Sequence, residues 1–261
     1  MNSDKVDILG VKVNIINMEE ACEEIFSIIK RDKSKAVVVT PNAEMIMRAR
    51  DNQELADILN NADLSLPDGV GVLLASHLFN INIKERVSGF DLMVELLSEK
   101  KERNYSVYFL GAEPGVAEKM VENLKKFPKK TLPSSKVFSS NIKISGFHHG
   151  YLNEKSKKEV IKEINEKKPD ILFVAMGVPL QEKFIKENME KLNTKVAITV
   201  GGSFDVLAGE LKRAPLWMQK IGLEWLFRLI QEPGRLKRMM SLPKFVFLAL
   251  KKALKFKKVE S

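Results

Sequence analysis

The stretch ADLSLPDGVGV, residues 62–72, holds a carboxylate at a place where chemistry is possible. Asp68 stands between Pro67 and Gly69, directly after an apolar run that is typical of a strand. Pro-Asp-Gly is also an ordinary turn signal, because proline presets φ, aspartate bonds nearby backbone and glycine tolerates a positive φ. Carboxylates also serve enzymes as general bases, so the rest of the chain has to decide between a turn and a functional residue.

Other junctions between expected strands and helices also carry small or polar residues. They are Thr40 and Asn42 in TPNAE, Gly111 and Gly115 in GAEPG, Gly177 and Gln181 in GVPLQEK, and Gly201 and Gly202 in GGSFD. Ligands of open α/β sheets bind at such junctions, and glycines there let backbone N–H groups approach a phosphate. A glycine at such a turn can equally be geometric. GAEPG matches neither G-x-G-x-x-G nor the P-loop, which disfavours a standard dinucleotide or ATP site.

The sequence offers little for a metal ion. The histidine pair His148 and His149 lacks helical i, i+4 spacing and a clustered carboxylate, and no Asp-x-Asp motif is present to hold a divalent cation between phosphates. We therefore expect no metal site and no cofactor. If a nucleotide diphosphate leaves, arginines and helix N-termini must stabilise it, and Arg86 in KERVSGFDL is a candidate. An isolated arginine is also commonly part of a structural ion pair.

Short β-branched runs alternate with amphipathic helical stretches through most of the chain. Strands are expected at 35–40, 105–111, 141–147, 170–177 and 195–202, and helices at 43–62, 116–127, 153–167, 181–192 and 204–211. Continuous apolar strands that are each followed by a helix predict an α/β fold, a Rossmann-like parallel sheet flanked by helices. The polar stretch 125–141 contains two prolines and is interpreted as a surface loop.

Charge divides the chain unevenly. Residues 212–258 hold 13 Lys and Arg but only two acids, Glu224 and Glu232, which gives this segment a net charge of +11, whereas the remainder of the chain carries −2. The strand pattern also stops at Leu211. We therefore expect an α/β catalytic body over 1–211 and a basic helical C-terminal appendage over 212–261 that meets a polyanionic partner, either membrane or nucleic acid.

Cysteine use and hydropathy point to the cytoplasm. The single cysteine, Cys22, has helical spacing with core residues, so a buried thiol is favoured over a nucleophile. The first residues show no signal peptide, and no apolar run approaches the roughly 20 residues that cross a bilayer.

Seven motifs in this order and spacing resemble those of the WecG/TagA/CpsF family of bacterial glycosyltransferases, with the TagA-type N-acetylmannosaminyltransferases as the nearest type. The motifs are VVTPNAEM, ADLSLPDGVGV, ERVSGFDL, FLGAEPGVAE, GFHHGYL, ILFVAMGVPLQEKFI and VGGSFDVLAG. The likeness runs from about residue 7 to the basic tail. An insertion around 128–140 departs from the more compact family pattern, but it lies between motifs.

The resemblance implies an inverting hexosyltransferase. It would move N-acetylmannosamine from UDP onto lipid-linked N-acetylglucosamine (GlcNAc-diphospho-undecaprenol) through a β-1,4 linkage, in synthesis of the wall teichoic acid linkage unit. An alternative keeps the fold but uses UDP-glucose or UDP-N-acetylmannosaminuronic acid for another surface polysaccharide. The sequence leaves a homo-oligomer open.

The resemblance also assigns roles to residues. The proposed base of the family falls on Asp68, and site residues of the family match Thr40, Asn42, Arg86 and Gln181. The arginines that the family's appendage brings toward the active site match Arg228, Arg235 and Arg238, while the junction glycines would bind UDP.

The tail has three interpretations. On a helical wheel, Lys244, Lys251, Lys252, Lys255 and Lys258 share one face, and the opposite half is apolar: Phe245, Val246, Ala249, Leu250, Ala253, Leu254 and Phe256. Phe247, Leu248 and Lys257 break this pattern. The first interpretation is a helix that packs on its own domain. A lysine-rich amphipathic helix is typical of proteins that lie on anionic bilayers, and the family appendage is held to bind membrane. We expect a peripheral protein on the inner face of the cell membrane. A nucleic-acid-binding module with a nucleotide-sensing body is the rival from another class, but the tail lacks a recognisable reading motif.

Overall fold

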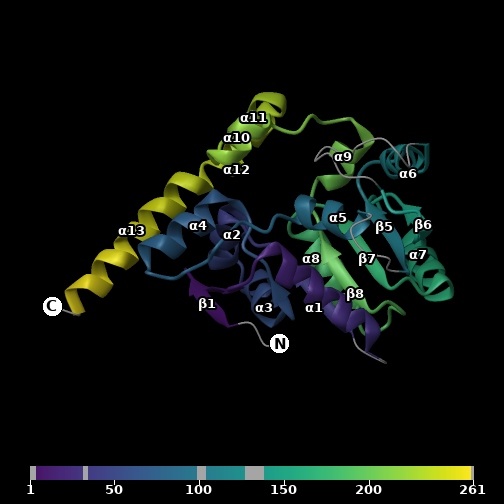
Figure 1. The fold of residues 1–261 in the computed structure, drawn as a ribbon, viewed down its shortest axis with the longest axis horizontal. Helices are drawn as coiled ribbons and strands as arrows, with labels where there is room; N and C mark the ends of the chain where they lie inside the picture. The colour runs from purple at the N-terminus through teal and green to yellow at the C-terminus, as the bar shows by residue number, and fades with distance from the viewer. Residues whose placement is uncertain (1–3, 32–34, 99–103, 127–137, 260–261) are drawn as a thin grey trace. The chain divides into compact units, whose positions relative to one another are not determined.

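A computed structural model describes residues 4–31, 35–98, 104–126 and 138–259 (Figure 1). The chain forms two compact units, each built from separate segments. The first unit contains residues 1–20, 40–88 and 213–261, and the second contains residues 21–39 and 89–212.

The sheet is parallel and has six strands in the order β4-β3-β8-β7-β5-β6. Its strands are β3 (Ala36–Val39), β4 (Leu64–Ser65), β5 (Tyr105–Gly111), β6 (Ile142–His148), β7 (Ile171–Ala175) and β8 (Val196–Thr199). All but β4 belong to the second unit. In the register of the central strands Phe109 lies opposite Phe173, and Phe173 opposite Ile198. The α/β fold class expected from the sequence is confirmed.

The central strands β5, β7 and β8 are mostly apolar because both faces of the sheet are covered there, whereas β6 also contains Lys143 and His148. All five residues of β7 are buried. Tyr108 and Leu110 on one face pack with Val160 and Phe184 of two covering helices. On the other face, the ring of Phe109 stacks on Phe173 and meets Phe204 edge-on.

The helices of this unit follow the expected pattern, except for a helix over 89–97 that the sequence analysis did not predict. They are α1 (Met18–Lys30), which begins in the first unit, α5 (Gly89–Leu97), α6 (Val116–Lys126), α7 (Glu154–Lys167), α8 (Leu180–Asn188) and α9 (Ser203–Ala208). Figure 1 shows β5, β6 and β7 side by side, with α7 next to β6. Cys22 is buried in α1, as predicted. Most of the expected loop 125–141 lies outside the described residues.

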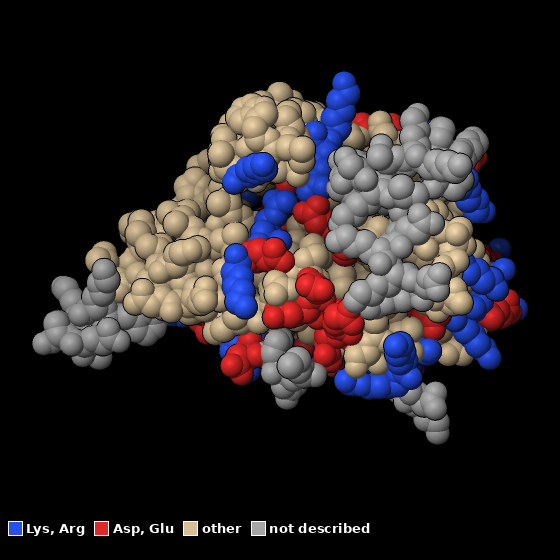
Figure 2. Space-filling view, in the orientation of Figure 1, with Lys and Arg blue, Asp and Glu red and all other residues tan. Residues whose placement is uncertain are grey.

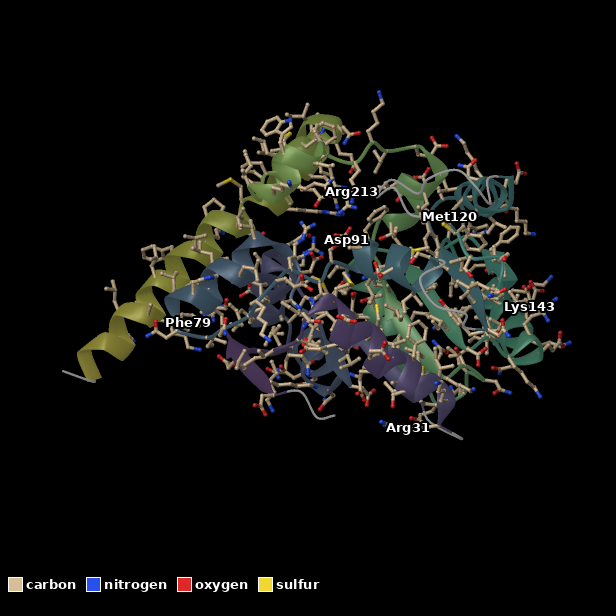
Figure 3. The ribbon with its side chains drawn as sticks, viewed as in Figure 1. Arg31, Phe79, Asp91, Met120, Lys143 and Arg213 are labelled. Carbon is tan, nitrogen blue, oxygen red and sulfur yellow. The ribbon has the colours of Figure 1, made fainter. Side chains whose placement is uncertain are left out.

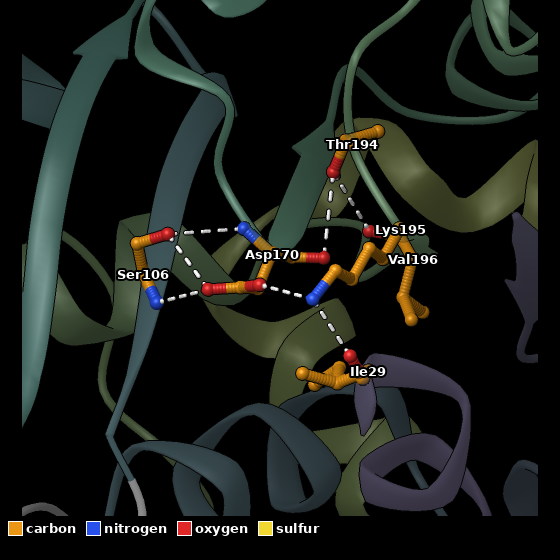
Figure 4. A network of polar contacts seen from close by, with 6 residues as sticks. All are labelled: Ile29, Ser106, Asp170, Thr194, Lys195 and Val196. Carbon is orange, nitrogen blue, oxygen red and sulfur yellow. Dashed lines mark hydrogen bonds and ion pairs between the residues drawn. The ribbon is translucent and has the colours of Figure 1, made fainter. Parts of the chain in front are cut away.

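A polar network ties together the amino ends of the central strands (Figure 4). Asp170 accepts hydrogen bonds from the backbone N–H and the hydroxyl of Ser106, both at 2.9 Å, and pairs with the Lys195 ammonium at 3.1 Å. Lys195 also donates to the carbonyl of Ile29 at 2.7 Å. Burial raises the pKa of Asp170, but the hydrogen bonds from Ser106 and Lys195 outweigh it, so the pKa lies below its ordinary value. The ionised carboxylate therefore joins β5, β7, β8 and α1.

The first unit is mostly helical. Its elements are β1 (Lys5–Ile8), β2 (Val11–Asn14), α2 (Ala43–Asp51), α3 (Gln53–Asn61), α4 (Gly69–Leu78), α10 (Leu216–Lys220), α11 (Glu224–Gln231), the 3₁₀ turn η1 (Pro233–Arg235), α12 (Leu236–Met239) and α13 (Ser241–Val259), together with β4. The strands β1 and β2 form an antiparallel hairpin that the sequence analysis did not predict. The single helix expected over 43–62 is in fact two, because Asn52 ends α2 and caps α3 through its side chain. Pro233 and Gly234 begin η1, which separates α11 from α12.

Helix α13 packs against α2 and α4, beside which it runs in Figure 1. Its buried stripe is Phe245, Ala249 and Ala253. The packing is close, because a Cβ at Gly71 of α4 would lie 2.9 Å from the Ala43 Cβ and 3.2 Å from Leu242. The division of the chain at residue 211 stays a prediction, since residues 213–261 form one unit with residues 1–20 and 40–88.

The apolar half of α13 expected from the wheel is only partly buried. Leu250 and Leu254 of that half are 44% and 63% exposed, and Phe247, which lies outside it, is 65% exposed. Phe247, Leu250 and Leu254 lie at i, i+3 and i+7 on the outward side. Lys252 turns back to its own unit, where it pairs with Asp7 and lies over the ring of Phe79, which is labelled in Figure 3. In the view of Figure 2 the surface over α10–α13 is mostly free of charged residues. The outward side of α13 is therefore an apolar stripe beside Lys244, Lys251 and Lys255, all three of which are exposed.

Candidate active site

Backbone hydrogen bonds bring three segments of the first unit together. The Asp68 N–H donates to the Pro41 carbonyl at 3.2 Å, and the Val87 N–H donates to the Pro67 carbonyl at 2.8 Å. Each segment carries a predicted site residue at or next to one of these hydrogen bonds. The backbone alone therefore brings Asn42, Asp68 and Arg86 close together.

Asp68 occupies the N-cap position of α4, with extended backbone at φ −106° and ψ 137°. Its neighbour Gly69 has φ +83°, where the left-handed region favours glycine. The turn interpretation of Pro-Asp-Gly is therefore correct for the backbone. The Asp68 side chain makes no capping hydrogen bond to α4.

Asn42 has a structural task of its own. It is the N-cap of α2, and its Oδ1 accepts a hydrogen bond from the Met45 N–H at 3.1 Å. The amide nitrogen Nδ2 is the part of this side chain that can serve a ligand as a donor. Thr40, which follows β3, is 6% exposed.

A cavity of about 250 Å³ gathers most of the predicted residues of the first unit. Its wall includes Asn42, Asp68, Arg86, Glu224, Arg228 and Arg235. Among the described residues of that wall, neither Thr40 nor Arg238 is present, and Arg238 is exposed. The cavity thus combines one candidate base with three guanidinium groups.

Glu224, in the wall of this cavity, pairs with two arginines. Its Oε2 accepts from Arg86 NH1 at 2.8 Å, and its Oε1 accepts from Arg213 Nε at 3.2 Å. Arg213 lies just before α10 and is labelled in Figure 3, and its side chain is only 10% exposed. The Glu224 carboxylate therefore joins the beginning of α11 to Arg86, which lies 138 residues earlier in the chain.

Glu232 holds the other two arginines. Its Oε2 accepts from Arg228 Nε at 2.9 Å and from Arg235 NH1 at 3.0 Å. Burial raises the pKa of Glu232, but the hydrogen bond from Arg228 and the charges of both arginines lower it below its ordinary value. Burial also lowers the pKa of Arg235, and the neighbouring Arg228 adds to this. Arginine stays protonated in proteins, so the cluster keeps two cations and one anion.

The remaining predicted residues lie in the second unit, at the carboxyl ends of its strands. Gln181, at the start of α8, is 2% exposed; its Nε2 donates to Glu182 Oε1 at 2.7 Å, and its Oε1 accepts from the Gly201 N–H at 3.2 Å. Gln181 therefore contacts the Gly201–Gly202 turn directly.

The junction glycines have structural reasons of their own. Gly111 ends β5 with φ +147°, and a Cβ there would lie 2.3 Å from the Ala175 carbonyl oxygen, so only glycine allows the two strand ends to approach. Gly115, Gly177 and Gly201 also have positive φ values. These conformations are compatible with phosphate binding but do not require it.

Comparison with known proteins identifies the family. The sequence model of the Glycosyl transferase WecG/TagA/CpsF family matches residues 6–259. The chain belongs to the WecG/TagA/CpsF family of glycosyl transferases. It is 38% identical over 221 residues to the N-acetylglucosaminyldiphosphoundecaprenol N-acetyl-beta-D-mannosaminyltransferase of Bacillus subtilis strain 168, covering 84% of this chain and 80% of the relative. A protein of the same name from Staphylococcus aureus strain MRSA252 is 33% identical over 261 residues, covering 99% and 97%.

This WecG/TagA/CpsF protein contains site residues that the sequence analysis did not single out: Arg213, Glu224 and Glu232. The signal was present, since Glu224 and Glu232 are the two acids among the 13 basic residues of 212–258. An acid in so basic a segment is a candidate partner for arginines. For Glu224 the partner Arg86 depends on the fold, because it lies 138 residues away, whereas both partners of Glu232 lie within four residues.

The ranges that the structure describes contain neither a metal-binding cluster of side chains nor a membrane-spanning helix. Among the described residues, no group of three or more His, Cys, Asp or Glu side chains is placed to hold a metal ion. No helix in the described part of the chain has the length and hydropathy to cross a membrane. Independence of metals stays a prediction.

Proposed function

We propose that this glycosyl transferase moves N-acetylmannosamine from UDP-N-acetylmannosamine to N-acetylglucosaminyldiphosphoundecaprenol through a β-1,4 linkage, in synthesis of the wall teichoic acid linkage unit. The acceptor and the sugar are those printed in the names of its relatives from B. subtilis and S. aureus. The observation that carries the proposal is the cavity of the first unit, where Asp68 and three arginines meet.

Asp68 is the proposed general base. The acceptor hydroxyl oxygen attacks the anomeric carbon of the donor sugar, the bond from that carbon to the diphosphate oxygen breaks, and UDP leaves with the electron pair. Asp68 takes the proton of the attacking hydroxyl as the new bond forms. A single displacement inverts the anomeric configuration and yields the β-linked product.

The arginines are proposed to offset charge on the leaving group. Negative charge grows on the UDP diphosphate as the bond breaks, and fixed cations stabilise such charge most in a site that excludes water. Guanidinium forks match phosphate oxygens. We assign this role to Arg86, Arg228 and Arg235 and extend it to Arg238, which is exposed. At about 250 Å³ the cavity is smaller than typical drug-sized sites of ~300–1,000 Å³, so it suits the diphosphate and the adjoining sugar rather than the whole donor.

The other predicted residues would position the substrates. Thr40, Asn42 through Nδ2, and Gln181 would orient the sugars. Gly111, Gly115, Gly177, Gly201 and Gly202 would offer backbone N–H groups to UDP. We propose no metal and no cofactor for the step.

We further propose that residues 212–261 act as an appendage that docks on the anionic inner face of the cell membrane, with the protein otherwise cytoplasmic. The support is the +11 charge of 212–258 and the exposed stripe Phe247, Leu250 and Leu254 beside exposed lysines. Large exposed apolar patches mark interaction surfaces, and a bilayer explains the apolar stripe and the lysines together. A nucleic acid would use the lysines alone.

The test of the reaction is mass analysis of the product formed from a lipid-linked N-acetylglucosamine acceptor and a panel of UDP-sugars. We expect transfer of N-acetylhexosamine from UDP-N-acetylmannosamine. Transfer from UDP-glucose or UDP-N-acetylmannosaminuronic acid alone would contradict the proposed donor and favour the alternative for another surface polysaccharide.

Sedimentation with anionic vesicles tests the membrane surface. Leu250→Glu with Leu254→Glu changes two exposed side chains, so the fold should persist while vesicle binding falls at least tenfold. Lys155→Glu on α7 is a control, because this exposed change shifts the net charge by the same amount outside the proposed surface. Equal loss in both variants, or RNA binding in gel shift with none to vesicles, would count against membrane docking.

A further inference from the structure

The segment from Arg228 to Arg235 packs two cations around one anion by purely local geometry. Glu232 follows the last residue of α11, so Arg228 lies one helical turn before it, and the 3₁₀ turn places Arg235 three residues after it. Backbone bonds fix the same segment, because the Glu232 N–H donates to the Arg228 carbonyl and the Arg235 N–H to the Glu232 carbonyl. The spacing Arg-x-x-x-Glu-Pro-Gly-Arg therefore brings the three side chains together within one short segment.

The contact pattern leaves most of each guanidinium for a ligand. A guanidinium has five N–H donors, and Glu232 takes one from Arg228, at Nε, and one from Arg235, at NH1. Both arginines belong to the cavity wall, whereas Glu232 is not among the described residues of that wall. The carboxylate thus holds the arginines from behind rather than occupying the cavity.

We infer that Glu232 is a positioning residue that holds Arg228 and Arg235 together as a preformed clamp for the diphosphate of the donor. The inference rests on the proposed function, in which these arginines bind the leaving group. Two guanidiniums drawn to one oxygen repel each other, and the shared carboxylate offsets that repulsion before any substrate arrives. When the diphosphate binds, its charge adds to that of Glu232, and the clamp needs no rearrangement.

A plain helix-end ion pair is the rival interpretation, and it predicts different behaviour. An ordinary i, i+4 pair on a surface contributes little to stability and nothing to ligand affinity. Removal of a nearby negative charge should even strengthen the binding of an anion. A surface ion pair thus predicts unchanged UDP affinity after loss of Glu232, and simple removal of a negative charge predicts tighter binding. Only the clamp predicts weaker UDP binding.

The experiment measures UDP affinity of the full chain by titration calorimetry. We expect Glu232→Gln, which keeps the size but not the charge, to weaken UDP binding about tenfold with an unchanged thermal midpoint. Glu232→Asp keeps the charge but is one methylene shorter and cannot reach both arginines, so it should weaken binding in the same direction. Glu159→Gln breaks another i, i+4 pair, on α7, and should leave UDP affinity unchanged.

A double-mutant cycle separates this inference from the proposed function. Once Arg235→Ala has removed the second guanidinium, the further change Glu232→Gln should no longer weaken binding. UDP affinity that is unchanged or higher in Glu232→Gln, or losses from Glu232→Gln and Arg235→Ala that simply multiply, would overturn the positioning role while the arginines keep theirs. Unchanged affinity in both Arg228→Ala and Arg235→Ala would instead refute the proposed role of the arginines, and Glu232 would have no clamp to hold.

Discussion

Asp68→Asn should abolish most turnover while the fold and UDP binding persist. Asparagine has the size of aspartate and is an equally good N-cap residue, so the start of α4 at Gly69 should be unaffected. The variant cannot accept the proton of the attacking hydroxyl. Loss of a general base costs about 10²–10⁴ in rate, which corresponds to roughly 2.7–5.5 kcal/mol at 1.36 kcal/mol for each factor of ten.

The cavity supplies a matched control for this change. Glu44 is, with Glu224, one of two further carboxylates of its described wall, and it forms an i, i+4 ion pair with Arg48 at 2.9 Å. Glu44→Gln removes the same charge from the same cavity, and the pair is worth only about 0.3–0.5 kcal/mol. We therefore expect its turnover to stay within about threefold of wild type.

The assay is the initial rate of UDP release with a short acceptor, measured across pH and accompanied by UDP affinity and thermal midpoint. In the wild type the rate should fall on the acid side as the base becomes protonated, and this limb should vanish in Asp68→Asn. Activity of Asp68→Asn within threefold of wild type, with an unchanged pH profile, would remove Asp68 from the role. An equal loss in Glu44→Gln would show that cavity charge, and not a base, controls the rate.

Three further outcomes are expected. Phe245→Ala empties a fully buried site between α13, α2 and α4, so urea unfolding of the first unit should show a loss of about 3–5 kcal/mol, and a change below 1 kcal/mol would contradict this packing. Asp170→Asn should be less stable than the wild type at neutral pH. Because the pKa of Asp170 is depressed in the folded state, the wild type loses the same stabilisation as pH falls below about 4. The difference in free energy of unfolding between the two proteins should therefore shrink between pH 7 and pH 3, and a constant difference would argue against the network as its source. Turnover should survive EDTA, and complete loss that Mn²⁺ or Mg²⁺ restores would reveal a metal site.

Much of the second unit could be predicted from the sequence because its strands are buried on both faces. The run YSVYFLG has no polar interruption beyond Ser106, and β5 spans the predicted residues 105–111. Short-range polar signals were harder to interpret. Asn52 sits in a polar stretch that fits a continuous helix, and only its side-chain bond to the Leu55 N–H divides α2 from α3.

In the site, too, the features that depend on neighbouring residues could be predicted from the sequence, and those that depend on distant residues could not. Asp68 and Asn42 stand in motifs whose turn chemistry is local, so their place at the ends of strands was accessible from the sequence. The partner of Arg86 was not, because Glu224 lies 138 residues away and is met only after the chain has folded. Glu232 was accessible in principle, since both of its partners lie within four residues.

The exposed side chains Phe247, Leu250 and Leu254 also affect how the molecule behaves in water. In the absence of lipid, two copies can shelter these side chains from solvent by burying them against each other. Salts such as sulfate strengthen apolar burial and screen the lysines that keep copies apart, so both effects favour such pairing. Self-association and membrane docking would then compete for one surface, and added vesicles should dissociate the oligomer rather than recruit it.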